Sequence, residues 1–394
     1  MKITNIESLH ADAGWRNFSF LKITTDEGLI GWSEYNQSYG SRGVSGVIDQ
    51  LAPIILGSDP IDNDVIFARL YAITRQAPGG INSQAIAAIE NALLDVKGKA
   101  LGVPVYQLLG GAMRDRLRLY WSHCGTYRMD ERSASHIGKP VLKSLDDVRA
   151  LGAEVKGRGF TGLKCNMYLF DDQPRRFGGG FAGRVGAPGF PELNAERSVI
   201  RGVYDEIAAF NEGTDNDVDI LLDLNYNFKV EGYIKMIRAL EPLELFWAEL
   251  DIYNPEALSY IRDRTNTPIA SCESLYGIRD FRLFFQMKSM DVAIIDVPWN
   301  GIWQSYKIAC IADAHEVNVA PHNFYGHMST FMSAHLCAAI PNFRIMEIDI
   351  DDVPWKDDLV THPPEIVDGH LILSDRPGWG SDINEDAVKA HPPR

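Results

Sequence analysis

Residues 217–228 read Asp-Val-Asp-Ile-Leu-Leu-Asp-Leu-Asn-Tyr-Asn-Phe, an apolar run that ends in Asp223. A short apolar run between polar residues is typical of a buried strand. In parallel α/β folds, functional side chains lie at the carboxyl ends of such strands. We therefore expect Asp223 to lie at the carboxyl end of a strand in a parallel sheet.

The same pattern repeats along the following part of the chain. Further apolar runs lead in turn to Glu249, Glu273, Asp296, His322 and Glu347. From Asp223 onward, successive members of this series are 23 to 26 residues apart. A strand, a helix and two loops together need roughly 25 to 30 residues. The spacing predicts successive βα units whose strand ends face one mouth.

The first barrel strand is expected at 117–121, ending near His123, and the second at 160–166, with Lys164 near its carboxyl end. The stretch 170–192 is rich in glycine, arginine and proline. A long irregular insertion at a barrel mouth is more often functional than accidental, although a plain mobile loop is the alternative.

The N-terminal third has a different pattern. We expect short antiparallel strands over residues 1–35, then a helix capped by Asn82-Ser83 that ends at Leu101-Gly102. The C-terminal tail is too short to fold alone and should pack on this N-terminal part. The expected domains are a capping domain (1–116), a barrel (117–352) and a returning tail (353–394).

Composition excludes several classes of function. The net charge of −15 disfavours nucleic acid and anionic membranes as partners. The start has no apolar signal core, and no run approaches the length of a membrane span. The five cysteines are widely spaced without a Cys-x-x-Cys pair, which predicts buried free thiols. We expect a soluble, cytoplasmic protein.

Three of the strand-end groups, Asp223, Glu249 and Glu273, come from successive strands. Unpaired carboxylates this close together repel one another, and a hard divalent cation such as Mg²⁺ resolves the conflict. Any one of them alone could equally be a helix cap or a salt-bridge partner. The set of three predicts one Mg²⁺ site.

The remaining strand-end groups suggest proton transfer. Asp296 beside His322 would fix the imidazole tautomer and raise its basicity, which makes a general base or acid. Lys164 would face His322 across the metal, and Glu347 could hydrogen-bond the substrate. Such a set can remove the weakly acidic proton next to a carboxylate, because the metal stabilises the enolate, as in the enolase-type sites that exemplify this chemistry.

At these residues, and in residues 88–111, the sequence resembles the mandelate racemase and muconate lactonizing branch of the enolase superfamily. The resemblance implies a modified TIM barrel, (β/α)7β, with an α+β capping domain made from the N-terminal segment and the C-terminal tail. It also implies Mg²⁺ ligands at Asp223, Glu249 and Glu273, and a catalytic dyad of Asp296 and His322.

Further roles follow from the same resemblance. Glu347 would contact the substrate carboxylate, and the loops around Arg16, Asn17 and Tyr35 would close over the substrate. Substrate contacts are also expected from the polar side chains at the barrel mouth, which are His123, Asn166 and Asn225. The small-molecule substrate is expected to be a sugar acid, and the protein a homo-oligomer, from dimer to octamer.

The sequence departs from the family pattern at two positions. The second strand reads Lys164-Cys165-Asn166, where the subgroup usually has a second lysine as a base, and Asn225 replaces a histidine of some dehydratases. A single base, His322, favours dehydration, so we expect a sugar-acid dehydratase, a hydro-lyase. The alternatives are an epimerase or lactone cycloisomerase with Lys164 or Tyr168 as second proton carrier, and a barrel that binds a sugar acid without turnover.

Overall fold

The computed structural model describes residues 1–38, 41–178 and 195–394. Tyr39 in the expected second capping loop, and the part of the expected 170–192 insertion after Gly178, lie outside these ranges.

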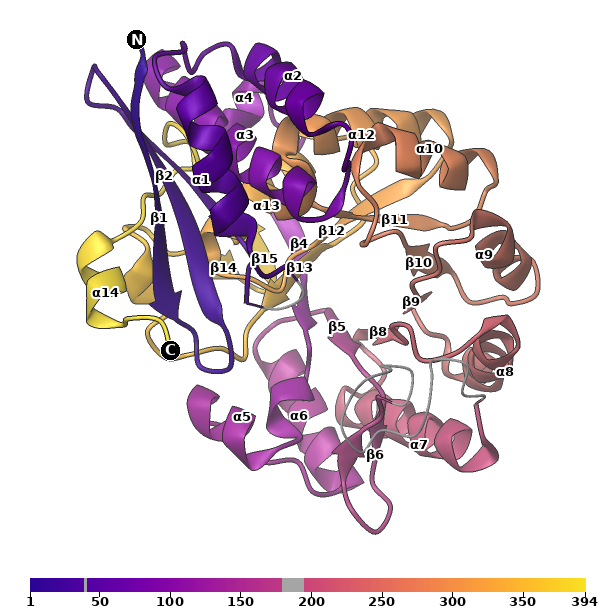
Figure 1. Ribbon diagram of the computed structural model, residues 1–394. Helices are drawn as coiled ribbons and strands as arrows, with labels where there is room; N and C mark the ends of the chain where they lie inside the picture. The colour runs from indigo at the N-terminus through magenta and orange to yellow at the C-terminus, as the bar shows by residue number, and fades with distance from the viewer. Residues whose placement is uncertain (39–40, 179–194) are drawn as a thin grey trace.

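The N-terminal part forms a three-stranded antiparallel sheet of β1 (Ile3–Asp12), β2 (Asn17–Thr25) and β3 (Ile30–Tyr35), as predicted (Figure 1). β1 forms although its apolar residues do not alternate, because its backbone pairs with β2 along almost its whole length. The helices of this part are α1 (Val44–Ile55), α2 (Asn63–Thr74), α3 (Gly80–Leu101) and α4 (Val105–Leu108).

The start of α3 corrects one prediction. The helix begins at Gly80 with Gly79 as its N-cap, so Asn82 and Ser83 lie inside it, and the Ser83 hydroxyl accepts from the Gly79 amide at 3.1 Å. Gly79 and Gly80 have φ values of 82° and 51°, so the chain turns into the helix before Asn82. The other end is as predicted, since Gly102 with φ of 68° terminates the helix.

Parallel strands follow, and each of them up to His322 is paired with its neighbour in the series. They are β4 (Arg116–Ser122), β5 (Gly162–Cys165), β8 (Asp219–Asp223), β9 (Trp247–Glu249), β10 (Ile269–Ser271), β11 (Val292–Asp296), β12 (Asn318–His322) and β13 (Met346–Asp349).

The two ends of this strand series meet. β13 pairs in parallel with β4, with Asp349 opposite Ser122. On the other side, the Val319 amide of β12 donates to the Asn342 carbonyl at 2.8 Å, and the Arg344 amide donates to the Val319 carbonyl at 2.9 Å. The strands therefore form the predicted (β/α)7β barrel.

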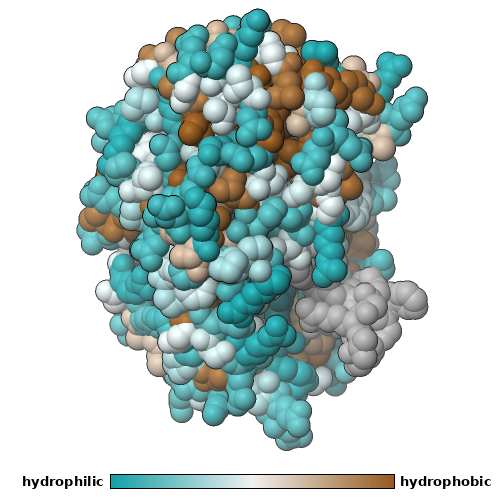
Figure 2. Space-filling model, turned by 60° about the vertical axis from the view of Figure 1, so that its left-hand side comes forward, coloured by the Kyte–Doolittle hydropathy of each residue, from teal (hydrophilic) through white to brown (hydrophobic). Residues whose placement is uncertain are grey.

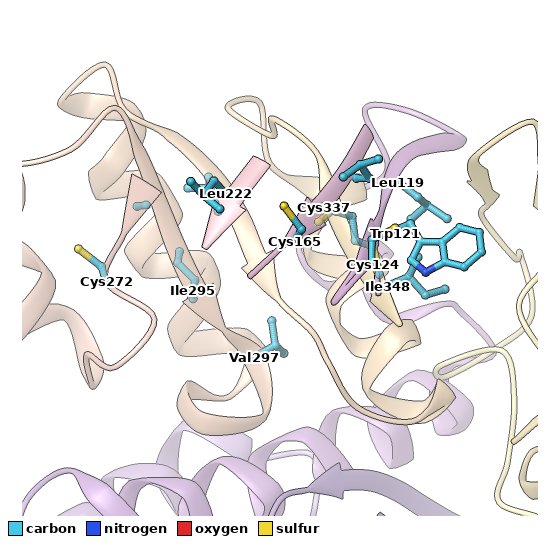
Figure 3. Packing of buried hydrophobic residues seen from close by; sticks show 14 of the residues in the cluster. Leu119, Trp121, Cys124, Cys165, Leu222, Cys272, Ile295, Val297, Cys337 and Ile348 are labelled. Carbon is cyan, nitrogen blue, oxygen red and sulfur yellow. The ribbon is translucent and has the colours of Figure 1, made fainter. Parts of the chain in front are cut away.

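Helices surround the barrel on its outer side, as Figure 1 shows for α6 to α10. Buried residues such as Trp121, Leu222, Ile295 and Ile348 fill the layer between strands and helices (Figure 3). The helices between barrel strands are α6 (Leu145–Gly157), α7 (Arg197–Gly213), α8 (Val230–Leu240), α9 (Pro255–Arg262), α10 (Gly277–Gln286), α12 (Ile302–Ala314) and α13 (His327–Ala339).

Shorter elements decorate the loops. β6, directly before the expected insertion, pairs as a small hairpin with β7, which lies within the insertion. The short elements are η1 (Thr126–Arg128), α5 (Glu131–Ile137), β6 (Tyr168–Leu169), β7 (Arg175–Arg176), η2 (Glu241–Leu243), α11 (Val297–Asn300) and η3 (Asp357–Leu359).

A separate apolar cluster fills the inside of the barrel. It consists of Tyr120, Leu221, Trp247, Ala270, Val292, Ile294, Ala320 and Ile345. Because side chains alternate along a strand, residues two positions further on face the same interior. This places Asp223, Glu249, Asp296, His322 and Glu347 above the cluster, at the mouth of the barrel.

The surface and the cysteines test two further predictions. Hydrophilic residues predominate on the face shown in Figure 2, in line with the charged composition. Within the described ranges, no helix has the length and apolar character needed to cross a bilayer. All five cysteines are free thiols as predicted, but Cys310 is exposed rather than buried.

The C-terminal tail packs back on the N-terminal part, as predicted, and it also extends the barrel sheet. Its elements are β14 (Ile366–Val367), β15 (His370–Ile372) and α14 (Glu385–Ala390). β15 pairs antiparallel with β4, and α14 lies beside β1 (Figure 1).

A buried carboxylate in α3 joins the two ends of the chain. Asp95 accepts hydrogen bonds from the backbone amides of Trp32 at 2.8 Å and Trp379 at 2.9 Å, and it pairs with Lys99 at 2.6 Å. Gly378 makes this approach possible, because a Cβ atom there would lie 2.1 Å from Asp95 Oδ1. The contact between helix and tail therefore requires glycine at this position.

We predict that Gly378→Ala lowers the free energy of unfolding by roughly 2–4 kcal/mol, since it adds a steric clash to the strain of a left-handed residue. Gly102→Ala is the matched control, because Gly102 has nearly the same φ, 68° against 65°, but nothing within 4 Å of the added Cβ. Urea denaturation of both variants measures the difference. An equal loss of unfolding free energy in the two variants would contradict the prediction, because it would mean that the clash with Asp95 adds no destabilisation.

Candidate functional site

The carboxyl ends of the barrel strands open into a cavity of about 720 Å³. Several predicted site residues line it: His123, Lys164, Asp223, Asn225, Glu273 and His322. Glu249, Asp296 and Glu347 lie buried beside these residues, each at most 1% exposed. The structure thus brings Lys164 and all six strand-end groups to one end of the barrel.

Asp223 and Glu249 are direct neighbours across the β8–β9 pair. Burial raises the pKa of Glu249 to about 8; Lys164 opposes the shift, whereas Asp223 and Glu273 add to it. A fourth carboxylate, Asp251, lies in the same group, and its pKa is raised well above the usual range by burial and then by Glu273 and Asp223. Several negative groups therefore share a buried space without enough positive charge.

Glu273 reaches the cavity through an irregularity in the backbone. Alternation from Ala270 would direct Cys272 toward the interior and Glu273 away from it. Cys272 instead adopts φ of 91°, a conformation that non-glycine residues rarely take, and Glu273 lines the cavity. This turn brings the third carboxylate toward Asp223 and Glu249.

The donor set matches a hard divalent cation in its chemistry. Carboxylate oxygens from three neighbouring strands are the ligands that Mg²⁺ prefers, and their repulsion would be relieved by a cation. Among the described residues, however, no three His, Cys, Asp or Glu side chains are gathered around one point at metal-binding spacing. Glu249 instead accepts hydrogen bonds from Lys164 at 3.2 Å and from the Trp247 indole at 3.2 Å.

Lys164 is held between two carboxylates. Its ammonium group lies 3.2 Å from Glu249 and 2.9 Å from Glu347. Burial alone would lower the lysine pKa, but Glu249 and Glu347 raise it well above the usual range. Lys164 is therefore held as a positive charge at the mouth of the barrel.

Glu347 is fully engaged by its neighbours. It accepts hydrogen bonds from the Asn323 amide at 2.6 Å and from the Ser122 hydroxyl, in addition to the Lys164 contact. Burial would raise its pKa, but Lys164 and His322 lower it to about 2. Glu347 thus remains ionised and orients Lys164.

Asp296 and His322 are neighbours in the β11–β12 pair and form the expected dyad. His322 Nδ1 lies 2.6 Å from Asp296 Oδ2, and the Tyr325 hydroxyl donates to the same oxygen at 2.6 Å. Because a carboxylate only accepts, Nδ1 carries the proton and Nε2 faces the cavity, 3.6 Å from Glu273 Oε2. Burial lowers the pKa of His322, but Glu273 and Asp296 raise it overall to about 10.

Asn166 and Asn225 belong to a hydrogen-bonded group on the opposite side. The Asn225 amide donates to Asp223 Oδ1 at 2.6 Å, and its oxygen accepts from Arg176 at 3.2 Å. Asn166 accepts from the Thr126 hydroxyl at 2.8 Å. The Tyr168 hydroxyl donates to the Cys124 carbonyl at 2.8 Å, and Tyr168 is fully buried, away from the cavity lining.

The structure places Arg16, Asn17 and Tyr35 away from the cavity lining that the described residues form. Arg16 is buried against Asp349 at 3.3 Å and Asp352 at 2.9 Å. Asn17 contacts the C-terminus through Arg394, and the Tyr35 hydroxyl is bonded to Ser45 at 2.7 Å. The expectation that these three side chains reach the substrate is therefore not supported by their positions.

Trp15 is the residue by which the first capping loop reaches the cavity. Its ring stacks on Phe324 at 6.4 Å between centroids. Aromatic rings form much of the cavity wall, namely Trp15, Tyr127, Tyr226, Tyr253, Tyr276, Trp299 and Phe324.

Three acidic or phenolic groups of the site were not anticipated. Asp349 has a signal in the sequence, since it follows Glu347 by two positions on one strand and so shares its face. Asp251 similarly follows Glu249 by two positions. Tyr325 has no such signal, because it lies in the loop after β12 and its hydroxyl reaches Asp296 only through the folded backbone.

Comparison with known proteins supports this architecture. Residues 147–387 match the enolase C-terminal domain-like family, and residues 10–110 match the mandelate racemase / muconate lactonizing enzyme N-terminal domain. A D-xylonate dehydratase from Haloferax volcanii is 27% identical, over 99% of this chain and 89% of the relative. A D-galactonate dehydratase from Xanthomonas oryzae is 29% identical, over 99% and 94%.

A solved structure of a candidate L-alanine-DL-glutamate epimerase from Burkholderia xenovorans is 49% identical, with a TM-score of 0.96, over 100% of this chain and 99% of that chain. The same protein was also solved with magnesium and fumarate. A 3,6-anhydro-D-galactonate cycloisomerase from Zobellia galactanivorans, 24% identical with a TM-score of 0.81 over 99% of both chains, shares the fold. The chain belongs to the enolase superfamily, in its mandelate racemase and muconate lactonizing branch.

Proposed function

We propose that the protein is a Mg²⁺-dependent sugar-acid dehydratase. The proposal rests mainly on one observation: the two sides of the barrel mouth differ in the groups that could transfer a proton. The Asp296–His322 dyad directs His322 Nε2 toward the cavity, whereas on the opposite side Lys164 is held between two carboxylates. The neutral amide of Asn166 is buried behind the cavity lining on that side, where it accepts from Thr126. A single base is sufficient for elimination of water, but racemisation normally needs two.

In this proposal His322 Nε2 takes the proton next to the substrate carboxylate. Asp296 and Tyr325 hold the imidazole in the tautomer that leaves Nε2 free. Lys164, fixed by Glu347, offers its charge to the substrate carboxylate. When held by Asp223, Glu249 and Glu273, Mg²⁺ would stabilise the enolate and offset the Glu273 charge that raises the pKa of His322.

The similarity to dehydratases over nearly the full chain supports elimination of the β-hydroxyl as water. An epimerase is the second candidate, favoured by the 49% identical structure. Neither second proton carrier expected for an epimerase is well placed, because Tyr168 is buried behind Thr126 and Lys164 is held between Glu249 and Glu347. Proton NMR of the products from a panel of sugar acids separates the two activities.

We predict that Glu249→Gln abolishes turnover and Mg²⁺ binding, measured by calorimetric titration, while the circular dichroism spectrum is unchanged. The substitution removes one carboxylate charge from the predicted ligand set. Glu231→Gln, on the exposed face of α8, is the matched control and should retain activity. Full activity after exhaustive chelation would contradict the role of the metal.

His322→Asn should reduce turnover by about 10³-fold or more, because general base catalysis is lost, while the substrate still binds. Steady-state rates and equilibrium binding of the same sugar acid measure the two effects separately. His315→Asn, at an exposed helix end, is the matched control. A variant with more than about a tenth of the wild-type rate, a barrier change below about 1.4 kcal/mol, would mean that His322 is not the base.

If His322 is the single base, it removes and returns the α-proton on the same face of the substrate, which determines the stereochemistry of hydrogen exchange with solvent. In D₂O with a slow substrate, deuterium should enter the α-position only with retention of configuration, as read by NMR of recovered substrate. Asn166→Lys should open exchange from the second side, because a lysine can carry the proton that an amide cannot. Formation of the inverted, deuterated epimer by the unmodified enzyme would favour the isomerase instead.

A further inference from the structure

A second histidine at the cavity has the same kind of carboxylate partner as His322. His123 lines the cavity, and its Nδ1 lies 3.2 Å from Asp349 Oδ1 and 2.9 Å from the Ser122 hydroxyl. The Ser122 hydroxyl donates its own proton to Glu347. Both neighbours of Nδ1 therefore act as acceptors, so Nδ1 carries a proton and Nε2 is left for the cavity.

Asp349 is held firmly as the partner of this second histidine. Besides His123, it accepts from the Tyr127 hydroxyl at 2.9 Å and from Arg16 at 3.3 Å. Burial would raise the Asp349 pKa, but His123 and Arg16 keep it well below its usual range. The ionised Asp349 therefore fixes the orientation of the His123 imidazole through its contact with Nδ1.

The two histidines face one compartment. Both pack against the ring of Phe324, whose centroid lies 5.0 Å from that of His322 and 5.7 Å from that of His123. The imidazoles therefore lie no farther apart than the sum of these two distances, which allows a small substrate to contact both. The His123 backbone has φ of 46°, a strained conformation of the kind that clusters at functional sites.

We propose that His123 is a second catalytic residue, which protonates the hydroxyl that leaves the substrate's β-carbon while His322 takes the α-proton. The inference rests on the proposed dehydratase function and refines it. From the sequence, His123 is expected only to bind the substrate. Its placement beside an ionised carboxylate, with one nitrogen toward the cavity, gives it the means to donate a proton.

His322 Nε2 accepts the α-proton, and the C–H electron pair moves onto the substrate carboxylate to give an enolate. This pair then returns to form the C=C bond of an enol as the β-carbon–oxygen bond breaks, and His123 Nε2–H transfers its proton to the departing oxygen, which leaves as water. The enol becomes the 2-keto acid by gaining a proton at the β-carbon and losing its hydroxyl proton, and the two histidines return to their starting protonation states by exchange with solvent.

The test separates proton abstraction from loss of the leaving group. The probes are the aldonate that the wild-type enzyme dehydrates fastest, from a panel that includes D-xylonate and D-galactonate, and its 3-deoxy-3-fluoro analogue. Fluoride needs little protonation to leave, so its loss does not depend on a general acid. The enzymes are the Mg²⁺-loaded wild type, His123→Asn, Asp349→Asn and the matched control His315→Asn.

In D₂O, His123→Asn should keep α-proton exchange but lose dehydration of the hydroxyl substrate, so the ratio of exchange to elimination rises by about tenfold or more. Fluoride release should fall less than about threefold, which also shows that the variant is folded. Asp349→Asn should also raise the ratio of exchange to elimination and lower fluoride release only slightly. His315→Asn should change neither quantity.

Two results would overturn the inference. The first leaves the dehydratase proposal intact, and the second contradicts it as well. If the wild type dehydrates an aldonate and His123→Asn shows an unchanged ratio, or loses exchange, dehydration and fluoride release equally, the leaving-group role of His123 is wrong and the dehydratase proposal stands. If the wild type exchanges the α-proton across the panel but eliminates neither water nor fluoride, the dehydratase proposal fails and the role of His123 fails with it.

Discussion

The arrangement of side chains at the barrel mouth depends on the pairing of buried charges. Lys164 lies between Glu249 and Glu347, above the apolar cluster that fills the barrel interior. Removing Glu347, which stays ionised, would leave the buried Lys164 ammonium group less well paired and would be destabilising. Among the described residues, Asp223 and Asp251 have no ion pair with a cation, and Glu273 has the His322 imidazole at 3.6 Å. This imbalance is the physical case for a bound divalent ion.

The barrel and the positions of its functional groups could be predicted because both depend on local periodicity. A two-residue alternation decides which strand residues face inward, and a repeat of 23 to 26 residues decides where strands recur. Glu273 was placed correctly only because the strand end was identified, since the φ of 91° at Cys272 that turns it inward has no sequence signal.

The capping loops were harder to predict, because a polar loop does not reveal which of its side chains turns inward. In the first loop Trp15 reaches the cavity, whereas Arg16 turns toward Asp349 and Asp352. Arg16 thereby connects the cap to the carboxylate that orients His123. A substitution of Arg16 would act on the chemistry at a distance, through Asp349, rather than through contact with the substrate.

The contacts of Asp95 bear on how the chain folds during its synthesis. This carboxylate accepts from the amide of Trp32 and from that of Trp379, which is synthesised only after all the barrel strands. Until Trp379 has emerged from the ribosome, the buried Asp95 lacks one of its two backbone partners. The contact between α3 and the tail therefore forms late, after the barrel strands between them have been made.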